Sequence, residues 1–136
     1  MSQENVGVVQ EVVEAAQRGD WAAAISRYDE TVELDTSRMP DGGVYHGHEG
    51  LQEFFARWFG AWDDFRISPE RFIEADDRVV VISQLRARGR STGIEVTMRL
   101  GDVYTVQDGK VVRMAGYPVA SEALEAVGLS EHEARS

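Results

Sequence analysis

The sequence contains no cysteine, only three prolines and no long hydrophobic run. Without cysteine there are no disulfides, thiolate zinc sites or cysteine nucleophiles, a composition typical of proteins in the reducing cytoplasm. No segment approaches the roughly 20 consecutive apolar residues that cross a membrane, and the first residues lack the basic and apolar regions of a secretion signal. We therefore expect a cytoplasmic protein with neither a leader nor a membrane span.

Positive charge is scarce as well, since 14 Lys and Arg stand against 24 Asp and Glu, for a formal net charge of −10. This balance argues against nucleic acids and anionic membranes as partners and says little about a neutral substrate. The 136 residues, 43% of them hydrophobic, suffice for one domain with a real core. We expect that domain over residues 1–129, followed by a polar tail over residues 130–136.

Helical patterns precede strand patterns along the chain. Apolar residues at spacings of three and four predict helices over residues 3–18, 21–28 and 48–62, with Gly19 and Asp20 as a stop and an N-cap. A brief strand is expected over residues 31–35 and a loop over 36–47; longer strands follow over 65–74, 78–88, 94–107 and 110–119, and a short helix over 121–127. Pro69 indicates a bulge or a sheet edge. This order is typical of an α+β fold in which a curved antiparallel sheet wraps around helices.

One acid stands in an apolar row of the strand expected over residues 94–107. Alternate side chains of a strand share a face, and this face carries Ile94, Val96, Met98, Leu100, Asp102, Tyr104 and Val106. Burying an unpaired carboxylate costs several kcal/mol, or the group takes up a proton instead. Asp102 is therefore a rim residue, a sign that the register differs, or a working group of a functional site.

The helix expected over residues 48–62 has an unusually aromatic stripe. Its apolar residues at helical spacing are Leu51, Phe54, Phe55, Trp58 and Trp62. These rings either pack in the core or wall a pocket, because aromatic side chains supply large apolar surfaces for both. Tyr28, Tyr104 and Tyr117 are open to two interpretations as well, as amphipathic core residues or as hydrogen-bond donors on an apolar wall.

Two histidines, His46 and His48, precede the aromatic helix. A metal site would need a third ligand at a recognisable spacing, and the sequence offers none, so no metal is predicted. One of the two is expected near the helix start, as a cap or at a pocket rim. His46 is also a candidate general base near neutral pH.

Five short motifs follow one another along the chain: GDW at 19–21, YDETV at 28–32, YHGHEGL at 45–51, DGKVV at 108–112, and EAL with GL at 122–129. Their order and spacing resemble the nuclear-transport-factor-2-like superfamily, in its polyketide-cyclase-like (SnoaL-like) branch. The resemblance implies a cone of three N-terminal helices packed in the concave face of a strongly curved mixed or antiparallel sheet, with a short C-terminal helix. It also implies a hydrophobic cavity at the mouth of the cone and a homodimer.

The superfamily includes ketosteroid isomerase, limonene-epoxide hydrolase, polyketide cyclases and scytalone dehydratase, as well as members that only bind ligands. Asp102, followed by Val103, matches the place of the isomerase acid that donates a hydrogen bond to the developing oxyanion. Asp35 stands one residue after the place of the isomerase base, and Val12 stands near that of its tyrosine. The resemblance thus implies an acid–base site centred on Asp102, with Asp35 as a candidate base. His46 is the other candidate base, on the grounds of its own chemistry.

These observations predict a cavity that binds a small, largely apolar or aromatic molecule. The domain would be a cofactor-free acid–base enzyme of the isomerase, cyclase, dehydratase or epoxide-hydrolase type; the alternative is a non-catalytic ligand-binding or dimerisation module. A homodimer formed through the sheet is the expected assembly. The candidate catalytic residues are Asp102, Asp35 and His46, and the candidate ligand contacts are Tyr28, Phe54, Trp58, Trp62, Met98, Leu100, Tyr104 and Tyr117.

Overall fold

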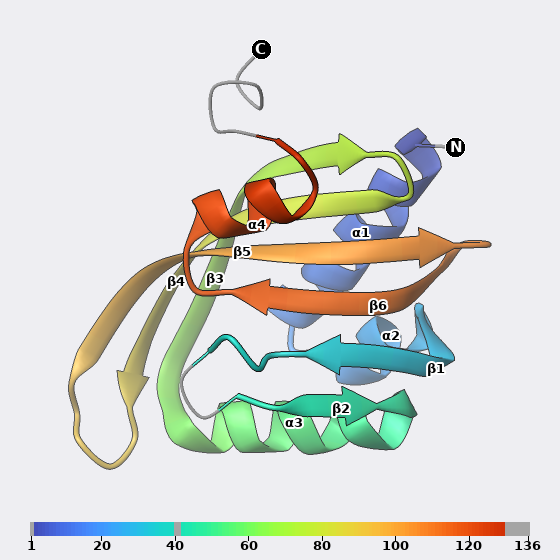
Figure 1. Ribbon diagram of the computed structural model, residues 1–136. Coiled ribbons are helices and arrows are strands. Elements are labelled where there is room, and N and C mark those ends of the chain that lie inside the picture. Colours follow the sequence, from blue (N-terminus) through green and yellow to red (C-terminus); the bar gives the residue numbers. More distant parts are fainter. Residues whose placement is uncertain (1, 40–41, 130–136) are drawn as a thin grey trace.

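The computed structural model describes residues 2–39 and 42–129, which form an α+β fold (Figure 1). The polar tail expected over residues 130–136 lies outside the described residues. The elements are α1 (Ser2–Gln17), α2 (Trp21–Ser26), β1 (Tyr28–Asp35), β2 (Val44–His46), α3 (Gly47–Ala61), β3 (Trp62–Ala75), β4 (Arg78–Gly89), β5 (Glu95–Gln107), β6 (Lys110–Tyr117) and α4 (Ala120–Ala126). None of the described helices is long and apolar enough to cross a membrane.

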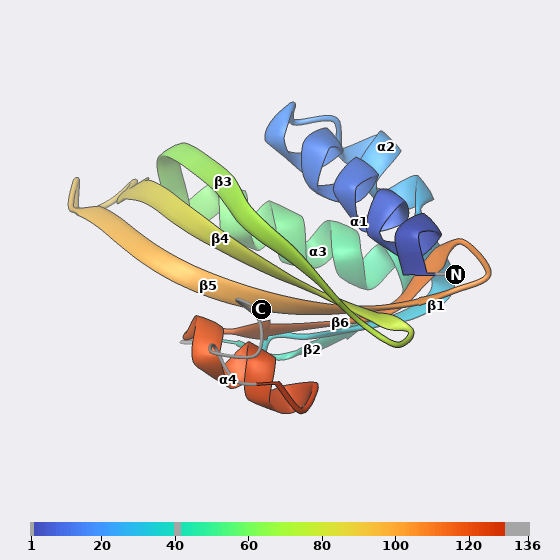
Figure 2. The same ribbon diagram turned by 90° about the horizontal axis from the view of Figure 1, so that it is seen from above.

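The six strands form one mixed sheet in the order β2-β1-β6-β5-β4-β3. Strands β1 and β6 run parallel, and every other neighbouring pair is antiparallel. Figure 2 shows the sheet bent around α1, α2 and α3 on its concave face, with α4 alone on the convex face. The predicted fold class, helices held in the concave face of a curved mixed sheet with a short C-terminal helix, is confirmed.

The core consists of two clusters, one on each face of the sheet. Between the concave face and the helices lie Val9 of α1, Val32 of β1 and Leu51 of α3, all without solvent exposure. On the convex face, Ile82 and Ala115 pack against Leu124 of α4. Removing these apolar surfaces from water is the main free energy that holds the three layers together.

Strand β5 divides its side chains between these two clusters. Leu100 and Tyr104 belong to the concave side, whereas Val103 packs under α4. At Gly101 an added Cβ would lie 2.5 Å from the Cβ of Ala123, so only glycine allows α4 to sit this close to the strand. The alternation expected along residues 94–107 is therefore present, and Asp102 faces the concave side.

Two expectations about local structure were wrong. The segment 36–47, expected as a loop, contains the short strand β2, in which Val44 pairs with Asp35 and His46 pairs with Glu33. Strand β1 begins at Tyr28, where the second helix was expected to continue. Three residues at a sheet edge carry too little alternation to predict a strand, and Val44 remains 49% exposed. The expectation for Pro69 is confirmed, since β3 is an edge strand with an irregularity between Pro69 and Arg71.

Candidate functional site

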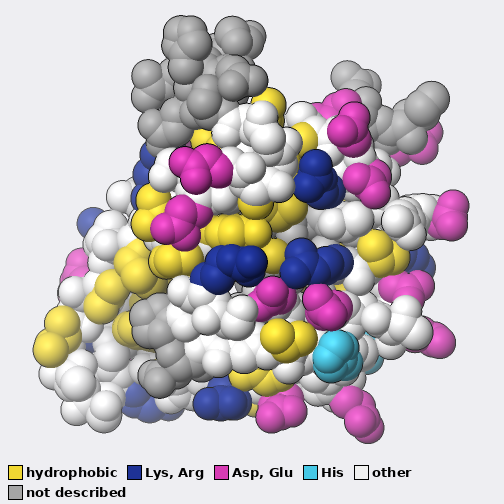
Figure 3. All heavy atoms as spheres, viewed as in Figure 1, with side chains coloured by type: hydrophobic (Ala, Val, Ile, Leu, Met, Phe, Trp, Pro, Cys, Tyr) yellow, Lys and Arg dark blue, Asp and Glu magenta, His cyan; other side chains and the backbone are white. Residues whose placement is uncertain are grey.

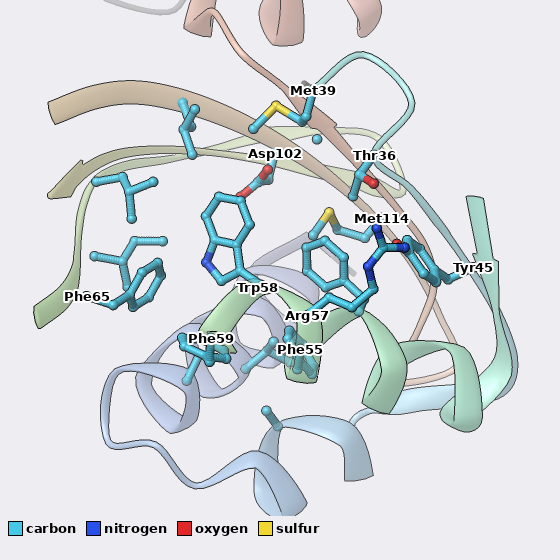
Figure 4. A pocket seen from close by; sticks show the side chains of 18 of the residues that line it. Thr36, Met39, Tyr45, Phe55, Arg57, Trp58, Phe59, Phe65, Asp102 and Met114 are labelled. Atoms are coloured by element: carbon cyan, nitrogen blue, oxygen red, sulfur yellow. The ribbon is translucent and has the colours of Figure 1, made fainter. Parts of the chain in front are cut away.

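A cavity of about 360 Å³ lies between the concave face of the sheet and the helices (Figure 4). Rings of α3 form one wall, including Phe54, Phe55 and Trp58, and the opposite floor carries Asp102 of β5 and Met114 of β6. Thr36 and Met39, which follow β1, also line the cavity. Mostly apolar side chains from the helices and from the concave face of the sheet thus line the cavity.

The aromatic wall arises because α3 presents successive rings on one side. Phe54 and Trp58, four residues apart, stack with 6.1 Å between ring centroids, and Tyr45 meets Phe54 edge-on at 5.5 Å. Leu51, one turn earlier, has no solvent exposure, whereas Phe54 and Trp58 are half-buried and face the cavity. The helix therefore combines core packing at its start with a cavity wall further along.

Asp102 lies on the cavity floor directly across from Gly116 of β6. A Cβ added at position 116 would lie 3.4 Å from Oδ1 of Asp102, so the glycine leaves room beside the carboxyl group. No described cation forms an ion pair with Asp102. Burial among apolar side chains raises the pKa of Asp102 to about 7, because the ionised form is poorly solvated there. Near neutral pH this group can therefore both release and accept a proton.

Two tyrosines lie beside Asp102 in the same cavity. The side chains of Tyr28 and Tyr104 lie close enough to influence each other's pKa, and both line the cavity. Burial raises the pKa of both hydroxyls, and the negative charge of Asp102 raises the pKa of each further. They therefore stay protonated at neutral pH and can donate hydrogen bonds. His48 fixes this corner, because its Nε2 lies 2.8 Å from the carbonyl oxygen of Tyr28 and joins α3 to β1.

Asp35, a predicted base, does not line the cavity. It is buried, with its carboxylate accepting hydrogen bonds from the backbone N–H and the hydroxyl of Ser37 at 3.0 and 2.6 Å. Arg38 and Arg113 lie 3.3 and 3.2 Å from its Oδ2. The Ser37 hydroxyl is the main cause that lowers the pKa of Asp35, despite burial, with help from both arginines. The neighbouring Leu34 occupies the concave core, so strand parity places the two side chains on opposite faces.

Three other predicted residues are also absent from the cavity lining. His46 is exposed at the end of β2, where it is the N-cap residue of α3 without a side-chain capping bond. Tyr117 belongs to the cluster under α4, and the guanidinium of Arg38 lies 4.7 Å from its ring centroid. Met98 is half-buried on β5. The structure thus brings together Asp102 with Tyr28, Phe54, Trp58, Trp62, Leu100 and Tyr104.

Sequence reasoning missed several residues that line the cavity. Met114 lies opposite Tyr104 on the neighbouring strand, which only the pairing of β5 with β6 reveals. Tyr45 comes from the strand expected as a loop, and Arg57 flanks the aromatic stripe of α3. A signal existed for Arg57, since it follows Phe54 by three residues and so lies near the same side of the helix.

The described residues include no group of three or more His, Asp or Glu side chains that could hold a metal ion. The polar groups that reach the cavity are instead a carboxyl, a guanidinium and hydroxyls. Such groups suit proton transfer and hydrogen bonding to a small organic molecule.

The sequence matches the model of the SnoaL-like domain over residues 9–114. The chain belongs to the SnoaL-like family. No functionally curated protein matches this SnoaL-like chain.

Solved structures share the fold of this SnoaL-like domain over almost its whole length. An NTF2-like protein of unknown function from Burkholderia pseudomallei is 24% identical, with a TM-score of 0.78 over 94% of this chain and 99% of that one. TerC, co-crystallised with polyporic acid, is 25% identical, with a TM-score of 0.76 over 91% and 98%. A candidate SnoaL-like polyketide cyclase from Jannaschia sp. CCS1 is 19% identical, with a TM-score of 0.75 over 85% of both chains. A protein from Catenulispora acidiphila with a ketosteroid isomerase-like fold has a TM-score of 0.73 at 13% identity over 90% of this chain and 92% of that one.

Proposed function

We propose that this SnoaL-like domain binds a small, largely apolar molecule in its cavity and exchanges a proton with it through Asp102. The observation that carries the proposal is a carboxyl group with a pKa of about 7 on the floor of a cavity walled by aromatic rings. A general acid or base is most effective when its pKa lies near the working pH, and one placed group contributes roughly 10²–10⁴-fold in rate. Such a step needs no cofactor.

The roles of the surrounding groups follow from their chemistry. Protonated Asp102 would donate a hydrogen bond, or its proton, to an oxygen on which negative charge develops, as a neutral carboxylic acid in an apolar site can do. The protonated hydroxyls of Tyr104 and Tyr28 would orient that oxygen. Isomerisation, cyclisation, dehydration and epoxide opening all use such a step. Asp35 and His46 remain predicted bases, but their positions away from the cavity lining make Asp102 the stronger candidate.

The family supports a ligand-binding cavity. One structural neighbour is a candidate SnoaL-like polyketide cyclase, and another, TerC, was co-crystallised with the organic molecule polyporic acid. The stacked Phe54 and Trp58 offer a flat apolar surface suited to a ring system. We propose an apolar or aromatic ligand on these grounds.

Hydrogen–deuterium exchange on a simple ketone tests the proposal. In D₂O at pD 7, 2-acetonaphthone should lose its methyl proton signal faster in the presence of the protein. Ionised Asp102 can remove an α-proton, exchange it with the solvent and return a deuteron to the carbon. Asp102→Asn keeps the size of the side chain and removes the titrating group, so the acceleration should fall by about 10²–10⁴-fold. Catalysis by Asp102 would be contradicted if the ketone binds but exchanges at the same rate with the wild type, with Asp102→Asn and in buffer alone.

The alternative is a non-catalytic module that binds its ligand in the same cavity. One observation favours it: among the described residues that line the cavity, Asp102 is the only acid, so none of them supplies a second carboxyl group as its partner. Under this alternative, Asp102→Asn would leave ligand affinity nearly unchanged, and the wild-type protein would not accelerate exchange.

A cytoplasmic location stays a prediction.

We also propose that the chain forms a homodimer through the convex face of its sheet. Helix α4 covers part of this face over β4, β5 and β6. Figure 3 shows hydrophobic side chains intermixed with arginine or lysine and acidic side chains on this side of the molecule. Arg86 and Glu95 form an exposed ion pair on this face, with 3.6 Å between their side-chain atoms. In the dimer these side chains would contact the second protomer in place of solvent.

A further inference from the structure

The cavity carries one positive and one negative side chain. Among the described residues that line it, Asp102 is the only acid and Arg57 the only base. Asp102 lies on the floor, whereas Arg57 is exposed on α3 and therefore belongs to the opening. Figure 4 shows the guanidinium of Arg57 directed along the cavity wall toward Tyr45. The remainder of the lining is apolar apart from hydroxyl, indole and backbone groups.

The charge of Arg57 is not neutralised within the described part of the chain. Glu53 precedes it by four residues, a spacing that commonly pairs an acid with a base on a helix. The two form no ion pair; Arg57 instead donates a hydrogen bond to the hydroxyl of Tyr45 at 3.2 Å. By contrast, Arg88 and Arg90 lie 2.7 and 3.5 Å from Asp64 and Asp63. In a chain with 24 acids and 14 basic residues, a cation in a cavity lining that pairs with no described acid calls for an anionic partner.

We infer that the ligand of this cavity carries a carboxylate, which Arg57 binds at the opening while the apolar body of the ligand lies between the rings of α3 and Asp102. The inference rests on the proposed ligand-binding function and names the class of ligand. A guanidinium presents parallel N–H donors that match the two oxygens of a carboxylate. Tyr45 acts as a positioning residue, because its hydroxyl holds the guanidinium on the cavity side of the helix.

The electrostatics of the whole chain make this contact selective. A net charge of −10 repels anions at long range, so a carboxylate is bound only where a local cation overcomes that repulsion. On the floor, Asp102 with a pKa of about 7 is mostly protonated at pH 6, so the cavity then holds no second negative charge. An acidic ligand with its carboxylate at Arg57 and its apolar end at Asp102 is the arrangement these charges favour.

A matched pair of probes tests the inference. The two are 2-naphthoate and 2-naphthamide, which have the same ring system and nearly the same shape but differ in charge. Each is titrated into ¹⁵N-labelled protein at pH 6.0, where an ordinary carboxylic acid is ionised. The indole N–H signals of Trp58 and Trp62, both in the cavity lining, report binding at this site and give the dissociation constant.

The wild-type protein should bind 2-naphthoate more tightly than 2-naphthamide. Arg57→Met should weaken 2-naphthoate binding about fivefold or more and leave 2-naphthamide unchanged, because methionine keeps helix propensity and apolar bulk but has no charge. Arg86→Met is the matched control, since it removes the same charge from the opposite face of the sheet, and it should change neither constant. Tyr45→Phe should weaken binding of 2-naphthoate and leave binding of 2-naphthamide unchanged.

Two other results are decisive. Equal affinity of the wild-type protein for the two probes, unchanged in Arg57→Met, would overturn the inference and leave the proposed function standing. No shift of either indole signal with either probe would overturn both, because the cavity would then bind neither charged nor neutral naphthalenes.

Discussion

At the residue scale, the cavity is distinguished by Asp102, which lies beside Gly116 on its floor. The two face each other across β5 and β6, and the glycine leaves the carboxyl group without a bulky neighbour on that side. Burial among apolar side chains then raises the pKa of the carboxyl group to about 7. Because the folded chain holds this proton more tightly than the unfolded chain, the ionisation of Asp102 affects the stability of the fold.

This link predicts a pH dependence. In the unfolded chain Asp102 ionises near its ordinary pKa of 3.8, but in the folded chain near 7, so between these values the folded state binds more protons. The contribution of Asp102 to stability is full below about pH 4 and is lost as pH rises to 7, at a rate of about 1.4 kcal/mol for each pH unit. Asp102→Asn removes it, so the free energy of unfolding of the variant minus that of the wild type should increase over this range and level off above it.

Urea denaturation of both proteins between pH 4 and pH 8.5 measures this difference. A difference that stays constant across the range would mean that Asp102 ionises in the folded protein as it does in water.

At the element scale, α3 and α4 use the sheet in different ways. Helix α4 packs closely on the convex face, which Gly101 permits. Helix α3 anchors its first turn in the core through Leu51 and leaves its later rings half-buried around an open volume. Helix α4 is thus a packing element, whereas α3 is both a packing element and a wall.

Adding a single methyl group tests the packing of α4. Gly101→Ala places a Cβ 2.5 Å from the Cβ of Ala123 and should lower the free energy of unfolding by about 1–3 kcal/mol, because backbone and helix must move apart. Gly7→Ala is the matched control in α1, where no atom lies within 4 Å of the added Cβ. It should raise stability by about 0.5–1 kcal/mol through helix propensity. Thermal and urea unfolding of both variants measure whether stability falls in Gly101→Ala and rises in Gly7→Ala. The same change in stability in both variants would contradict the close packing of α4.

The division of labour within α3 gives a second prediction at this scale. Leu51→Ala should cost about 2–5 kcal/mol of stability, because the side chain is completely buried. Trp58→Ala should cost less, since its ring is half-buried, but should weaken binding of 2-naphthamide more than Leu51→Ala does. Unfolding and calorimetric titration separate the two effects. The reverse order, with Trp58 dominating stability and leaving affinity untouched, would identify its ring as core.

At the scale of the whole molecule, the curved sheet separates the cavity from the side proposed for assembly. Helices α1, α2 and α3 and the cavity lie on the concave face, and α4 lies on the convex face beside an uncovered part of the sheet (Figure 2). Cavity and interface can therefore change independently within one fold.

The proposed dimer predicts a solution mass of twice the 15.1 kDa of one chain in size-exclusion chromatography with light scattering. Thr97→Arg should shift the protein toward a monomer, because Thr97 is exposed on β5 opposite Arg86 and the added charge would lie beside a like charge in the interface. Gln107→Arg, at the far end of the same strand, adds the same charge and should leave the mass unchanged. A wild-type mass of one chain would contradict the dimer.

Sequence alone determined the elements with strong periodicity and the face of β5 on which Asp102 lies. Apolar spacing in α1 and α3 and strict alternation in β5 are local properties, and burial of one face follows from them. The Asp108-Gly109 turn and the N-cap at Asp20, which accepts a hydrogen bond from Ala23, are equally local. A three-residue edge strand such as β2 has no such signal in the sequence, because its conformation depends on pairing with β1.

Only the tertiary structure decided which of the polar residues meet. Asp35 stands one position from a concave side chain, and that single step turns it to Arg38 and Arg113 on the other face. Tyr117 lies under α4, and Arg57, unremarkable in the sequence, lines the cavity beside Tyr45. Periodicity describes each element by itself, whereas a site consists of side chains from several elements, whose distances depend on how the sheet bends and pairs.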